Sequence, residues 1–174
     1  MQISMVMTVI GQDRPGLVDS VASRVAEHGG NWLESRMSRL GGHFAGILRV
    51  EIPQEQEQSL VRSLKSLEAE GLLVMVHADR PPPLAREKKL SLLEIVGQDR
   101  RGIVRQIFRV LASHGVNVEE LETERSSAAM SGEMLFKAQA RLDIPASCNV
   151  KELRKQLEKI AEDLIVDISF QVCS

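Results

Sequence analysis

The sequence has few cysteines, no excess of charge of either sign and no long hydrophobic run, and each absence excludes a class of protein. Its 174 residues include two cysteines, Cys148 and Cys173, too few and too widely spaced for a disulfide framework or a zinc site. No apolar stretch approaches the roughly 20 residues that a helix needs to span a bilayer. No basic segment precedes the first apolar run, as it would in a secretion signal. We therefore expect a cytoplasmic protein without a metal or a membrane partner.

The balance of charge argues against nucleic acid as a direct partner. Lysine and arginine number 22 and aspartate and glutamate 24, which gives a formal net charge of -2. A protein that holds DNA or RNA through the phosphates normally carries a basic excess or a basic stripe. Because the two signs are mixed along this chain, we expect no direct binding of nucleic acid.

The chain contains an internal repeat, which is the most informative feature present. The segment VIGQDRPGLV at 9–18 returns as IVGQDRRGIV at 95–104, so that Gly11 corresponds to Gly97 with an offset of 86. The segment HGGN at 28–31 returns as HGVN at 114–117 with the same offset. Two matches in one register indicate a duplication. With 43% hydrophobic residues, the chain can form two small modules, each with a thin core.

The offset rises to 92 where Pro53 corresponds to Pro145, so the second copy has six more residues. They fall near 126–132, where we expect an extended hairpin loop. Between the copies, the three prolines of 81–83 exclude a helix or a central strand. This stretch is either a semi-rigid linker, which we adopt, or a polyproline ligand of an SH3-type domain. The expected organisation is a first domain at 1–80, a Pro-rich linker at 81–89 and a second domain at 90–174.

The hydrophobic pattern of each copy predicts the order strand, helix, strand, strand, helix, strand. In the first copy we expect a strand at 3–10, a helix that Pro15 opens and Gly29 ends, a hairpin of strands 32–40 and 44–52, a helix up to Gly71 and a strand at 72–76. The second copy repeats this order and ends with a strand at 164–172. Alternation of apolar and polar residues indicates one buried sheet face, which both helices should cover. The predicted fold class is α+β, with two tandem βαββαβ ferredoxin-like modules.

The glycine-containing loop between the first strand and the first helix of each copy is the candidate ligand site. Its glycines allow close approach of the backbone, and a helix start offers unpaired N–H groups that suit a carboxylate. Asp13 can accept a hydrogen bond from an ammonium group, so the loop suits a zwitterionic amino acid; alternatively, Asp13 only caps the helix. The candidate residues are Gln12, Asp13, Arg14, Pro15, Gly16 and Leu17 in the first copy and Asp99, Arg100, Gly102 and Ile103 in the second.

Asn31 and Asn117 begin the second strand of each copy, which we expect to lie beside this loop. An asparagine side chain both donates and accepts hydrogen bonds, as a carboxylate and an ammonium group require. Alternatively, each asparagine only completes a turn after a glycine. Because the asparagines recur together with the loop, we include both in the candidate ligand site.

Two histidines and one tryptophan carry less information. His28 and His114 are expected in the last turn of a helix, where a histidine meets the helix dipole favourably, and no triad or metal-ligand spacing accompanies them. Trp32 is either a core anchor or an interface residue. We therefore predict that the protein is not an enzyme and uses no cofactor.

The segments DRPGLV at 13–18 and HGGN at 28–31 resemble those of the ACT domain, a βαββαβ module that binds amino acids and regulates metabolism. The resemblance covers both copies. In the second copy Arg101 replaces the usual proline and Val116 the second glycine. We therefore expect the first loop to be the better-formed amino-acid site.

A free-standing pair of ACT modules is similar to the glycine cleavage system transcriptional repressor family. This resemblance implies that the protein restrains a transcriptional activator, of the LysR type, by protein–protein contact, with glycine as its signal. It also implies ligand binding at interfaces between ACT modules, which a homodimer would supply. The alternative is a regulatory ACT pair that acts in trans on an enzyme of amino-acid or folate metabolism, because similar single modules precede the catalytic domain of formyltetrahydrofolate deformylases.

Overall fold

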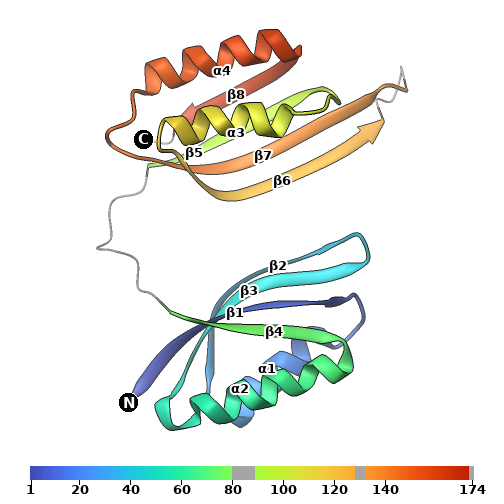
Figure 1. Cartoon of the computed structure of the whole chain (residues 1–174), viewed down its shortest axis with the longest axis vertical. Helices are drawn as coiled ribbons and strands as arrows, with labels where there is room; N and C mark the ends of the chain where they lie inside the picture. The colour runs from blue at the N-terminus through green and yellow to red at the C-terminus, as the bar shows by residue number, and fades with distance from the viewer. Residues whose placement is uncertain (80–88, 128–131, 173–174) are drawn as a thin grey trace. The chain divides into compact units, whose positions relative to one another are not determined.

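The computed structural model describes residues 1–79, 89–127 and 132–172, which form two units. Each unit has a four-stranded antiparallel sheet with two α-helices against one of its faces (Figure 1). The prediction of an α+β protein built from two βαββαβ modules is therefore confirmed. The expected linker, apart from residue 89, and residues 128–131 of the expected hairpin loop lie outside the described residues.

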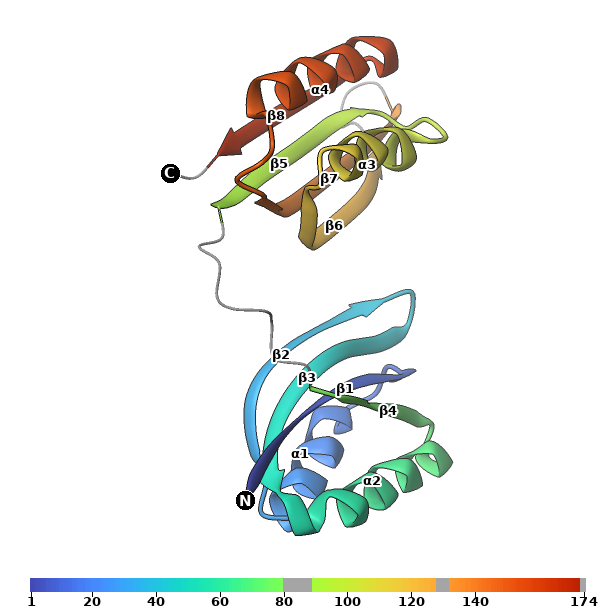
Figure 2. The ribbon, with the colours of Figure 1, turned by 60° about the vertical axis from the view of Figure 1, so that its left-hand side comes forward.

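The first unit has the sheet order β2-β3-β1-β4. Its elements are β1 (Gln2–Gln12), α1 (Leu17–Glu27), β2 (Asn31–Leu40), β3 (His43–Pro53), the short 3-10 helix η1 (Gln54–Gln56), α2 (Glu57–Ser66), the short 3-10 helix η2 (Leu67–Glu70) and β4 (Leu72–Ala78). Both helices lie on the same side of the sheet, as the turned view in Figure 2 shows. Neither of these helices covers the other face of the sheet.

The second unit has the corresponding order β6-β7-β5-β8. Its elements are β5 (Lys89–Gln98), α3 (Ile103–Ser113), β6 (Asn117–Ser127), β7 (Met134–Ile144), α4 (Val150–Leu164) and β8 (Val166–Val172). The last strand was predicted at 164–172, but Leu164 is the last residue of α4 and the strand begins at Val166. Ile165, in a left-handed conformation with φ 55°, separates helix from strand.

Each unit has its own hydrophobic core between the sheet and the helices. The buried stripe of α1 is Leu17, Val21 and Val25, and the buried positions of β3 alternate as predicted at Leu48, Val50 and Ile52. Burying each such side chain contributes roughly 1.5–3 kcal/mol. Trp32 is half-buried and packs against the first core, which supports its interpretation as a core residue.

Candidate ligand site

The loop after β1 lies against the hairpin that joins β2 to β3. Gln12 pairs with His43 in the sheet, and the Asp13 N–H donates to the Gly42 carbonyl at 2.9 Å. Gly16 is the N-cap of α1 and adopts φ 91°, a left-handed conformation that glycine accepts without strain. The helix therefore begins at Leu17. The prediction that Pro15 opens it was wrong, because this proline lies in the preceding turn.

The Asp13 carboxylate forms an ion pair with an arginine of β2. Asp13 Oδ2 lies 2.6 Å from Arg39 Nε, the short distance typical of a charge-assisted hydrogen bond. Asp13 does not cap α1, since the N-cap is Gly16 and no side chain there supplies a cap. The alternative that Asp13 only caps the helix is therefore wrong. Its side chain keeps 32% of its surface exposed, so part of the carboxylate remains open to solvent.

The second unit repeats this geometry. Asp99 Oδ2 lies 2.7 Å from Arg125 Nε, and the Asp99 N–H donates to the Met134 carbonyl at 2.9 Å. Gly102, the N-cap of α3, has φ 90° although Arg101 precedes it in place of a proline. The left-handed glycine is therefore what the two turns share, and the proline is dispensable.

Sequence reasoning missed the two arginines. Arg39 and Arg125 are separated by 86 residues, the offset of the repeat, so an extended comparison of the two copies would have found them. Their place opposite the aspartates depends on strand pairing, which sequence spacing alone does not give.

A hollow borders each loop at the start of its helix, about 340 Å³ in the first unit and about 710 Å³ in the second. Seven corresponding positions line both: Asp13, Arg14, Gly16, Leu17, Val18, Asp19 and Phe44 in the first, and Asp99, Arg100, Gly102, Ile103, Val104, Arg105 and Phe136 in the second. The side chains of Leu17 and Ile103 belong to the cores, with exposures of 4% and 2%. These two residues can therefore offer a ligand only their backbone N–H groups, which lack intrahelical acceptors at a helix start.

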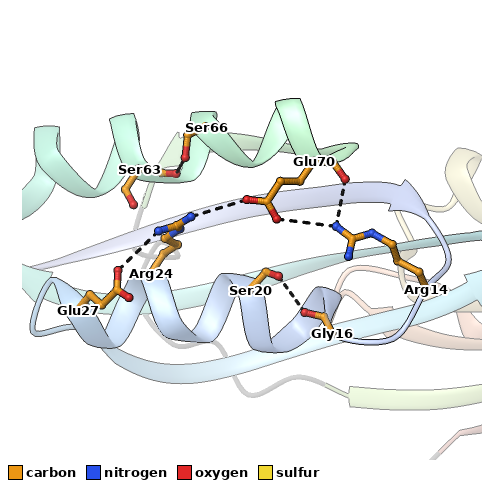
Figure 3. Close-up of polar contacts among 8 residues, drawn as sticks. All are labelled: Arg14, Gly16, Ser20, Arg24, Glu27, Ser63, Ser66 and Glu70. Carbon is orange, nitrogen blue, oxygen red and sulfur yellow. Dashed lines mark hydrogen bonds and ion pairs between the residues drawn. The ribbon is translucent and has the colours of Figure 1, made fainter.

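Arg14 links the first loop to the end of η2. Its Nη2 atom donates to the Glu70 carbonyl at 3.0 Å and lies 3.9 Å from the Glu70 carboxylate. Figure 3 shows Glu70 between Arg14 and Arg24, whose Nη2 atom lies 3.7 Å from the same carboxylate. The charge of Arg14 is thus partly matched within the first unit.

The second hollow is more cationic than the first. Arg105 stands where the first unit has Asp19, and Arg100 corresponds to Arg14. Both arginines are exposed, and neither has an ion-pair partner among the described residues. The two hollows therefore share a shape but differ in the charge that they present to a ligand.

The structure does not bring Asn31 to the loop of its own unit. Asn31 pairs with Glu51, which pairs with Ser4 near the start of β1, whereas Gln12 pairs with His43. From His43 to Glu51 the strand advances about 26 Å at 3.3 Å per residue. The second unit is the same, because Asn117 pairs with Asp143 and Gln98 with Leu135. The expectation that these asparagines lie beside their own loops was therefore wrong.

The difference between Gly30 and Val116 concerns the cores and not the loops. A Cβ atom at Gly30 would lie 2.7 Å from Ile52 Cγ2 and 2.9 Å from the Val25 carbonyl oxygen. Val116 is itself a core residue, with 7% of its surface exposed. It gives no reason to regard the second loop as the poorer site.

The histidines are C-cap residues, as predicted. His28 Nδ1 lies 2.7 Å from the Arg24 carbonyl oxygen, and His114 Nε2 lies 3.3 Å from Gln156 Oε1.

Burial raises the pKa of the Cys148 thiol above its ordinary value, which disfavours the reactive thiolate. Within the described ranges, no group of three or more His, Cys, Asp or Glu side chains could hold a metal ion. None of the helices in these ranges is long and apolar enough to cross a membrane.

Comparison with known proteins identifies the family. The ACT-domain family model matches residues 4–80 and 89–171, which correspond to the two units. The chain belongs to the ACT domain family. The predicted tandem of ACT modules is thereby confirmed, and the duplicated loop is the β1–α1 loop of one ACT module and its counterpart, the β5–α3 loop, of the other.

Several relatives match this tandem ACT protein over nearly its whole length. The glycine cleavage system transcriptional repressor of Escherichia coli K12 is 24% identical over 172 residues, which cover 97% of this chain and 89% of the relative. The crystal structure of an unknown protein from Galdieria sulphuraria is 29% identical in sequence, with a TM-score of 0.89 and full coverage of both chains. A solved structure described as a candidate glycine cleavage system transcriptional repressor is 18% identical, with a TM-score of 0.72, and shows the fold alone. The predicted resemblance to that repressor is confirmed, and a regulatory role for the ACT pair is supported.

Proposed function

We propose that this protein is an amino-acid-responsive repressor of the glycine cleavage system that acts by binding a transcriptional activator. The observation that carries the ligand-binding part is the duplicated loop, in which an aspartate paired with an arginine borders a hollow at a helix start in both modules. The repressor part is supported by the similarity to the repressor of Escherichia coli over 97% of the chain.

The chemistry of the loop fits a zwitterionic amino acid. The N–H groups at the start of α1 have no acceptors within the helix, and the macrodipole favours a negative charge there, so they suit the ligand carboxylate. The exposed part of the Asp13 carboxylate, with Asp19 on the same hollow, suits the ammonium group. Glycine has this pair of charges and no side chain to place, which makes it our proposed signal.

The proposed protein partner is a LysR-type activator of the glycine cleavage operon. The chain has a net charge of -2, so we assign the contact with operator DNA to the activator and not to the repressor. Regulation then depends on how glycine changes the contact between the two proteins.

A mobility-shift assay with the purified activator, its operator DNA and the full chain tests this proposal. We expect no retention of DNA by the chain alone at physiological salt, and a change in the activator–DNA complex when chain and glycine are added together. Asp13→Ala combined with Asp99→Ala should keep the fold and lose the response to glycine. Retention of operator DNA by the chain alone, or no effect on the activator complex, would overturn the repressor proposal. Binding of a metabolic enzyme in place of the activator would favour the alternative of a trans-acting regulatory subunit.

A further inference from the structure

The negative charges on the hollow of the second module are already matched by neighbouring cations. Asp99 and Glu124 both line this hollow. Asp99 Oδ2 lies 2.7 Å from Arg125 Nε, and Glu124 Oε1 lies 3.6 Å from Lys137 Nζ. The two carboxylates therefore have little charge left with which to attract the ammonium group of a ligand.

Two arginines on the same hollow have no such match. Arg100 and Arg105 are exposed, and neither forms an ion pair within the part of the chain that the structure describes. The segment 100–113, which carries them, contains four arginines and no aspartate or glutamate. Like charges gathered on one surface repel one another, so they do not stabilise the fold, but they do raise the local concentration of anions.

The first module shows why Arg100 lacks a partner. Its counterpart Arg14 donates to the Glu70 carbonyl at 3.0 Å and lies 3.9 Å from the Glu70 carboxylate (Figure 3). Glu70 is the last residue before the left-handed turn into β4. The last residue before the corresponding turn into β8 is Leu164, a core residue with 7% of its surface exposed. The second module thus keeps the arginine of the loop and lacks the carboxylate that neutralises it.

The charge at the first turn of the helix is reversed between the modules. Asp19 lines the first hollow and has no ion-pair partner among the described residues, whereas Arg105 occupies its position in the second. The first hollow therefore has an unmatched negative charge, and the second has two unmatched positive charges. An ammonium group is attracted to the first and repelled by the second.

We propose that the second hollow binds a small molecule with a phosphate group or with two carboxylate groups, in preference to glycine. Guanidinium groups bind both kinds of anion through paired, charge-assisted hydrogen bonds. The hollow measures about 710 Å³, against about 340 Å³ in the first module, so it has room for a ligand larger than glycine. This inference rests on the proposed function only in taking the duplicated loop as a ligand site, and it gives the two modules different ligands.

Calorimetric titration of the full chain with two matched pairs of ligands tests the inference. L-serine and O-phospho-L-serine differ only by a phosphate group, which adds a charge of about -1.5 to -2. L-glutamine and L-glutamate differ only by the charge of the side chain. At physiological salt, which screens distant charges, we expect the anionic member of at least one pair to bind roughly tenfold more tightly or better. A preference within the first pair alone identifies a phosphate as the group bound, and one within the second pair alone identifies a second carboxylate.

The main variant combines Arg100→Gln and Arg105→Gln, which remove both unmatched charges and keep long polar side chains. It should abolish the preference for the anionic ligand. The matched control combines Lys155→Gln and Lys159→Gln, two exposed residues of α4 that do not line the hollow, and so removes the same charge elsewhere in the module. The control should keep the preference of the native chain. Far-ultraviolet circular dichroism checks that both variants are folded.

The native chain alone can overturn the inference, because equal affinities within both pairs would show that the second hollow does not select anions. A folded control that loses the preference as fully as the main variant would also overturn it, since the effect would then come from net charge. Glycine is titrated in parallel. Glycine binding without any preference for anions contradicts this inference and leaves the proposed function standing. A preference for anions without glycine binding does the reverse for glycine as the signal.

Discussion

The Asp13 carboxylate lies 2.6 Å from the Arg39 guanidinium, and Asp99 lies 2.7 Å from Arg125 in the second ACT module. In both modules this ion pair fastens the loop before the first helix to the hairpin beside it. Because the pair recurs with the left-handed glycine and the hollow, the two loops are copies of one structural unit.

Replacing each aspartate by alanine separates stability from ligand binding. Arg39 and Arg125 are 71% and 60% exposed, so losing either pair should lower the free energy of unfolding by less than about 1 kcal/mol in urea titrations. Calorimetry should show a fall of at least tenfold in amino-acid affinity at the altered module. If Asp13→Ala and Asp99→Ala together leave the affinity intact, the aspartates do not contact the ligand.

Exchanging one charge between the modules should change which amino acids they prefer. Arg105→Asp gives the second hollow the residue of the first, and Asp19→Arg makes the reverse change. We expect Arg105→Asp to weaken the binding of L-glutamate more than that of glycine, because an arginine suits an additional carboxylate. Asp19→Arg should do the opposite. Equal effects on both amino acids in calorimetric titrations would show that this position does not select the ligand.

Gly30 should tolerate no side chain, although valine occupies the corresponding position of the second module. In Gly30→Val the new Cβ would meet Ile52 and the backbone of Val25, so overpacking should cost about 1–3 kcal/mol of unfolding free energy. Urea unfolding of the full chain measures the loss. An unchanged midpoint would mean that this part of the first core can shift to make room.

The carboxylate of Asp79 should make stability depend on pH. A hydrogen bond from the Ser4 hydroxyl and the Arg49 guanidinium lower the pKa of Asp79 below its ordinary value, against the opposing effect of burial. Because the pKa of this carboxyl is lower in the folded than in the unfolded chain, its ionised form stabilises the fold at pH values above the unfolded pKa, near 3.9. This stabilisation is lost as the pH falls through the folded pKa. Asp79→Asn should therefore be less stable than the native chain at pH 7, with the difference shrinking below about pH 4. A difference that is constant from pH 7 to pH 3 would contradict this assignment.

Much of the fold was predictable, because it follows from local patterns that recur. The repeat gave the two modules, alternation in residues 44–52 gave the buried face of β3, and Gly29 marked the end of α1. The start of this helix was misplaced because a proline suits a first helical turn, whereas here a left-handed Gly16 comes first.

The candidate site was harder to predict, because it depends on strand direction and register. A helix that follows β1 runs back along it, so the strand after the helix starts at the far end of the sheet. This reasoning would have placed Asn31 away from the Asp13 loop, as the structure does. The partnership of Asp13 with Arg39 depends on the register of the hairpin, which no pattern of residue types specifies.

Thermal unfolding of the full chain with each of the twenty amino acids in turn tests ligand sensing most directly. We expect at least one of them, with glycine the first candidate, to raise the melting temperature. At about 100 times its dissociation constant, the ligand should stabilise the fold by roughly 2.7 kcal/mol. The shift should decrease in the variant that combines Asp13→Ala and Asp99→Ala. If none of the twenty amino acids changes the melting temperature of the native chain, the proposal that these ACT modules sense an amino acid is contradicted.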